Sequence, residues 1–98
     1  METTDDVVES LMAKYYKLNV DTHAILLYCE VLGEKISQAA FNSMKWAFDQ
    51  KRQALKEVIE EIAELIPEED FIPWESLLGR AKHEARVRTG IFDPISLN

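Results

Sequence analysis

Four glutamates recur at spacings of three and four residues within the stretch "EVIEEIAE", residues 57–64. On a helix this spacing places all four on one side, opposite the apolar residues Val58, Ile59, Ile62 and Ile66. The four are Glu57, Glu60, Glu61 and Glu64. The simplest interpretation is a solvated helix face. Two functional interpretations remain beside it: a docking surface that attracts a basic protein, and a site for a hard divalent cation such as Mg²⁺.

The segment "EEIAEL", residues 60–65, resembles half of the acidic signature of the all-α nucleotide pyrophosphohydrolases. The resemblance implies a magnesium-dependent enzyme in which carboxylates of facing helices hold the ion. In that family a second helix carries a Glu followed three residues later by an Asp. Here Val87 lies three residues after Glu84, and Leu78 lies three residues after Glu75. The enzyme is therefore kept as an alternative, and we expect no catalysis, no cofactor and no metal site.

An aromatic and acidic segment, "EEDFIPW", follows directly at residues 68–74. Pro67 is expected to end one helix, and Pro73 suits the first turn of the next. The segment is then a solvated turn with an apolar corner. As a functional alternative it is a patch that docks a partner, because Trp and Phe are common interface anchors. Its candidate residues are Glu68, Glu69, Asp70, Phe71 and Trp74.

A short run of bases lies near the C-terminal end, at Arg80, Lys82, Arg86 and Arg88. Bases in the last turns of a helix interact favourably with its dipole, and these could also pair with the acidic helix. Nucleic-acid contact is the alternative interpretation. We do not expect nucleic acid to be the partner, because the bases form one small stretch of an acidic chain.

The chain of 98 residues is sized for one domain, residues 1–98. Its net charge of −7 arises from residues 57–70, which hold seven acids and no base, while eleven acids and eleven bases balance elsewhere. The single cysteine, Cys29, provides no intrachain disulfide, and the N-terminus is acidic. Both features predict a cytoplasmic protein. No apolar run approaches the ~20 residues that span a bilayer.

The apolar periodicity predicts four helices, at about 4–17, 22–32, 38–66 and 73–89. Asp21 or Thr22 is expected to cap the second helix, and Ser37 to precede the third. Gly33 is expected to end the second helix in the left-handed conformation, and Gly90 to stop the fourth. The fold expected is an all-α, four-helix bundle-like domain in which the third helix is long.

The third predicted helix is long for so small a domain. From residue 38 to 66 it would extend about 43 Å, whereas a compact domain of this size has a radius of gyration of about 13 Å. Either it breaks near residues 49–53, where the apolar stripe is interrupted, or it projects and pairs with a second chain. We expect a continuous helix and a homodimer.

These features together predict a non-enzymatic protein-interaction module. It would act as a small adaptor, a regulator or inhibitor, or a structural subunit of a larger assembly. Its size and acidity are typical of accessory proteins of phages and mobile elements. The partner would be another protein with a basic surface, bound through the acidic helix face and the aromatic corner.

Overall fold

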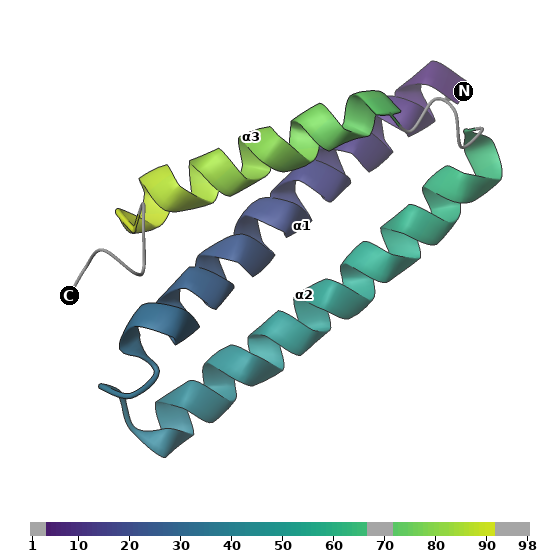
Figure 1. The fold of residues 1–98 in the computed structure, drawn as a ribbon. Helices are drawn as coiled ribbons and strands as arrows, with labels where there is room; N and C mark the ends of the chain where they lie inside the picture. The colour runs from purple at the N-terminus through teal and green to yellow at the C-terminus, as the bar shows by residue number, and fades with distance from the viewer. Residues whose placement is uncertain (1–3, 67–71, 92–98) are drawn as a thin grey trace.

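The computed structural model describes residues 4–66 and 72–91, and the regular secondary structure of these residues is helical. The helices are α1 (Thr4–Leu32), α2 (Gln38–Leu65) and α3 (Ile72–Thr89). Figure 1 shows α2 running antiparallel to α1, and α3 returning parallel to it. The all-α class expected from the sequence is confirmed, but the described residues form three helices where four were expected.

The helix α1 lies between the other two (Figure 1). It packs along both α2 and α3, whereas α2 and α3 hardly touch each other. Two buried clusters result. One joins α1 to α2 through Leu11, Val58 and Ile62. The other joins α1 to α3 through Val20, Ala24, Ala81 and Ala85.

The expected boundary between the first two helices, at residues 17–22, is wrong, because α1 continues through it. The polar residues there bond back into the helix instead of capping a new one. The Asn19 side-chain amide donates to the Tyr15 carbonyl at 2.8 Å, and the Thr22 hydroxyl donates to the Asn19 carbonyl at 3.1 Å. Both side chains are buried. Since no Gly or Pro interrupts this stretch, back-bonding satisfies the polar groups and the helix continues.

The long helix α2 is continuous, as expected, with no break at residues 49–53. The Ser37 hydroxyl accepts the Ala40 N–H at 3.1 Å and caps its start. Ile66 ends it with extended backbone, φ −126° and ψ 128°, as the residue before a proline favours. Its length is matched by α1 of the same chain, so the molecule is elongated, at 48 × 26 × 22 Å. Helix length therefore does not require a second chain, and the homodimer stays a prediction.

The two glycines expected to end helices do so in different ways. Gly90 has the left-handed backbone that a helix end favours, with φ 74°. Gly33 does not adopt it, so the left-handed conformation expected there is wrong. Instead its N–H donates to the Cys29 carbonyl at 3.0 Å. A Cβ at Gly33 would collide with that carbonyl oxygen and lie 3.4 Å from the Phe41 ring, so glycine is needed there for space.

The cluster between α1 and α2 depends on Ile62, which is 0% exposed. We predict that Ile62→Ala lowers the free energy of unfolding by about 2–4 kcal/mol, because it removes buried methylenes and leaves a cavity. Urea denaturation followed by circular dichroism measures it. The matched control is Ile59→Ala, one turn earlier on α2, where the side chain is 42% exposed. An equal loss in both variants would contradict this packing.

Candidate functional site

The outward face of α2 carries the four glutamates singled out by their spacing. Glu57, Glu60, Glu61 and Glu64 are all exposed, while Val58 and Ile62 of the same helix are buried against α1. Because α3 packs on α1 and hardly touches α2, it does not cover these glutamates. The structure thus brings them together as one solvent-facing surface, which we call the acidic face of α2.

A tryptophan that the sequence analysis did not single out also lies on this side of α2. Trp46 is 67% exposed. It precedes Glu57, Glu60 and Glu64 by 11, 14 and 18 residues, spacings that return to one side of a helix. Trp46 and Glu57 are about 16 Å apart along the helix axis. This spacing was the signal in the sequence that could have identified Trp46.

None of the glutamates of the acidic face enters an ion pair within the described ranges. The pairs found there gather at Asp21 of α1, whose carboxylate lies 3.2 Å from Lys51 of α2 and 3.1 Å from Arg88 of α3. Arg88 also approaches Glu84 at 4.0 Å. The expected pairing of the basic run with the acidic helix is therefore not observed. Arg88, a base of that run, pairs with Asp21 of α1 instead.

The four bases of the C-terminal run lie on two sides of α3. Arg80 and Arg88 lie near the Tyr16 hydroxyl, which donates to the Glu84 carboxylate. That hydrogen bond raises the pKa of Tyr16, and burial adds to the rise, while the two arginines oppose it. Lys82 and Arg86 lie instead near His23 of α1. The run is thus divided and does not form a single basic stripe.

The remaining predicted partner-binding residues cannot be placed on this surface. Glu68, Glu69, Asp70 and Phe71 lie outside the described residues. Trp74 belongs to α3, but its side chain is not among those described.

Within the described ranges, no group of three or more His, Cys, Asp or Glu side chains is arranged to hold a metal ion. The carboxylates of "EEIAEL" are directed to solvent and do not face acids of a neighbouring helix. Over the same residues, no helix combines the length and apolar character needed to cross a membrane.

Comparison with known proteins gives no relative from which a role could be transferred. No protein-family model matches the chain, and no curated protein or solved structure is similar to it. The geometry and charge of the described residues therefore carry the functional argument.

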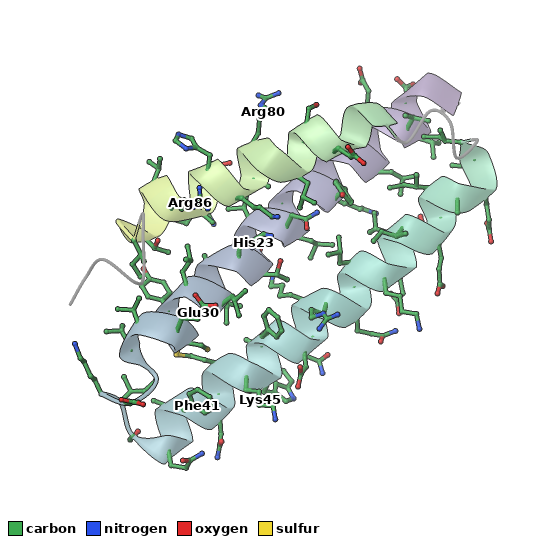
Figure 2. The ribbon with its side chains drawn as sticks, viewed as in Figure 1. His23, Glu30, Phe41, Lys45, Arg80 and Arg86 are labelled. Carbon is green, nitrogen blue, oxygen red and sulfur yellow. The ribbon has the colours of Figure 1, made fainter. Side chains whose placement is uncertain are left out.

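His23 is half-buried on α1. Figure 2 shows it between α2 and the part of α3 that carries Arg86. Burial lowers the pKa of the imidazole from its usual 6.5, and the nearby charges of Lys82 and Arg86 lower it further. All three causes act in one direction, because each disfavours the charged imidazolium.

This environment predicts a pH dependence of stability. The unfolded chain takes up a proton on His23 near pH 6.5, whereas the folded chain takes it up only at lower pH. Between these two values the unfolded state binds more protons, so the free energy of unfolding falls as the pH falls below about 6.5. We predict that His23→Gln loses less stability than the unsubstituted chain between pH 7.5 and pH 5, as measured by urea denaturation. The matched control is His83→Gln, the same substitution at an exposed position of α3, and an equal effect of both variants would contradict the role of His23.

A second prediction concerns Asp21, whose side chain is 17% exposed and meets bases from both flanking helices. We expect Asp21→Asn to lower the free energy of unfolding by about 1 kcal/mol, since partly buried ion pairs with two helices are lost. The loss should shrink in 1 M salt. Asp49→Asn is the matched control, because Asp49 is exposed and outside the ion pairs found. Thermal unfolding at low and high salt compares the two variants, and equal shifts would contradict the role of Asp21.

Proposed function

We propose that this chain is a non-enzymatic protein-interaction module that binds a partner with a basic surface on the acidic face of α2. The observation that carries the proposal is a group of four exposed glutamates that enter no ion pair with the described residues, on a helix side that neither α1 nor α3 covers. Such a module would serve as a small adaptor, a regulator or inhibitor, or a structural subunit of a larger assembly, as accessory proteins of phages and mobile elements do.

The four glutamates of the acidic face repel one another, because they lie three or four residues apart on the same helix. Glu57 precedes Glu60 by three residues and Glu61 by four, and Glu60 precedes Glu64 by four. Like charges at these spacings destabilise a helix by about 0.2–0.5 kcal/mol a pair. A basic partner would replace this repulsion with attraction, and the shared sign of the four charges would speed its association.

Trp46 would add an apolar contact with the partner to the charged contacts of the glutamates. Bound interfaces depend on a few large side chains, and Trp is among the commonest. A tryptophan 67% exposed on the same side of α2 offers such an anchor at one end of the acidic face. The expected partner therefore has several bases and an apolar pocket about three helical turns away.

The test uses a synthetic lysine-rich amphipathic helical peptide as the probe and the fluorescence of Trp46 as the signal. Trp74→Phe provides the background, so that Trp46 is the single tryptophan. Because Trp74 is itself a candidate partner-binding residue, calorimetry on the chain that keeps Trp74 measures whether this substitution changes the affinity. We predict salt-sensitive binding that Glu57→Lys, Glu61→Lys and Glu64→Lys, introduced together, weaken at least about tenfold. Trp46→Ala, followed by calorimetry, should weaken it about tenfold as well.

The matched control changes the net charge equally elsewhere. Glu9, Glu30 and Glu34 are exposed and lie off α2, so their joint substitution by Lys should leave most of the affinity. If both triple variants weaken binding equally, only the net charge attracts the peptide and the acidic face is not a site. Circular dichroism confirms that each variant stays helical.

A further inference from the structure

Two exposed bases of α3, Lys82 and Arg86, enter no ion pair with the residues that the structure describes. They lie four residues apart and therefore occupy one side of the helix. Arg88 differs from them, because its guanidinium pairs with Asp21 of α1. Val87, which follows Arg86, is 57% exposed and adds apolar surface beside these bases. We call Lys82 and Arg86 the basic patch of α3.

The basic patch of α3 and the acidic face of α2 carry opposite charges but do not meet within one chain. Figure 1 shows α1 between the two helices that carry them. Because α2 and α3 hardly touch, the pairing of these bases with the acidic helix that the sequence suggested is prevented inside the chain. Both surfaces are exposed, so the same pairing is open to two chains.

The spacing of the charges on the two helices is compatible with such a contact. Glu57 and Glu61 are separated by four residues, as are Lys82 and Arg86, which corresponds to about 6 Å along each helix axis. Two helices side by side can therefore bring both acids opposite both bases. Like charges four residues apart destabilise the helix that carries them, so this contact would offset the repulsion within both helices at once.

We propose that this chain associates with further copies of itself, with the acidic face of α2 of one copy against the basic patch of α3 of the next. The inference rests on the proposed function, and it names a second copy as the basic partner. The contact joins two different surfaces on opposite sides of α1, so each pair of copies leaves one surface of each kind free. Such a heterologous contact forms an open row rather than a closed dimer.

The net charge of −7 on each copy does not prevent this association at moderate salt. At an ionic strength of about 0.15 M the Debye length is about 8 Å. Repulsion between whole chains is then largely screened, whereas carboxylates and bases in contact still attract each other. The salt concentration is therefore held at this value in the experiments.

The first experiment measures the mass of the full chain by sedimentation and light scattering, from about 10 µM to about 1 mM. We expect the average mass to rise above the 11.3 kDa of one chain and to pass twice that value at the highest concentration. A mass that stays at one chain throughout would overturn the proposal. A mass that levels off at two chains would overturn it as well, because it indicates a closed dimer.

The second experiment reverses the charges of each surface. One variant combines Glu57→Lys, Glu61→Lys and Glu64→Lys, and the other combines Lys82→Glu with Arg86→Glu. Each variant alone should associate at least about tenfold more weakly, because both of its surfaces now have the same sign. An equimolar mixture should associate again, since each surface of one variant is complementary to a surface of the other. A mixture as weak as its separate components would contradict the pairing of these two surfaces.

The matched control for the basic patch is Lys14→Glu with Lys35→Glu, which makes the same change of charge at exposed bases outside α3. This control should keep most of the self-association, and mixing it with the triple glutamate variant should not restore the association of that variant. Weakening equal to that of Lys82→Glu with Arg86→Glu would show that only net charge matters and would overturn the site. Circular dichroism verifies that every variant is helical.

The lysine-rich peptide separates this inference from the proposed function. If the chain binds the peptide but keeps the mass of one chain, self-association is refuted and the acidic face serves a different basic protein. If the chain neither binds the peptide nor associates, both proposals fail. If the peptide binds and dissociates the assembled copies, both are supported, because peptide and basic patch compete for the same glutamates.

Discussion

The structure depends on the burial of α1 along two of its sides. Each flanking helix finds its apolar partner there, since α2 buries Val58 and Ile62 on α1 and α3 buries Ala81 and Ala85 on it. Because α2 and α3 hardly touch, neither can compensate for the loss of the other's contact with α1. The arrangement leaves wide outer surfaces on α2 and α3, and the charged residues of the chain are distributed over those surfaces.

The charged residues that lie between the helices differ in their contacts from those on the outer faces. Asp21 sits where bases of both flanking helices reach it, so one carboxylate links three helices. Within residues 4–66 and 72–91 the glutamates of the acidic face enter no ion pair, and their mutual repulsion is small but unfavourable. Because the repulsion between these four glutamates lowers the stability of the helix, their grouping is better explained by the binding of a partner than by the fold. This is the physical basis for considering that face a docking surface.

The helical class, the bounds of α2 and α3 and the outward placement of the four glutamates could be predicted from periodicity, proline positions and Ser37. The continuity of α1 could not, because Asn19 and Thr22 are both cap residues by type, and only burial decides that they bond back into the helix. The environment of His23 could not be predicted either. Lys82 and Arg86 of α3 lie close enough to lower its pKa, and sequence order does not show which side of α3 meets α1.

The position of Arg52 limits how far the acidic face of α2 extends round the helix. Arg52 lies five residues before Glu57 and eight before Glu60, and it lines a hollow of α2 together with Glu60. A basic partner on the glutamates would therefore meet a like charge at that edge. The bases of such a partner are better matched by Glu57, Glu61 and Glu64, which lie further round the helix from Arg52 at 100° a residue. Because the only extensive contact of α2 in the described structure is with α1, a partner bound there would act on the rest of the fold through α1.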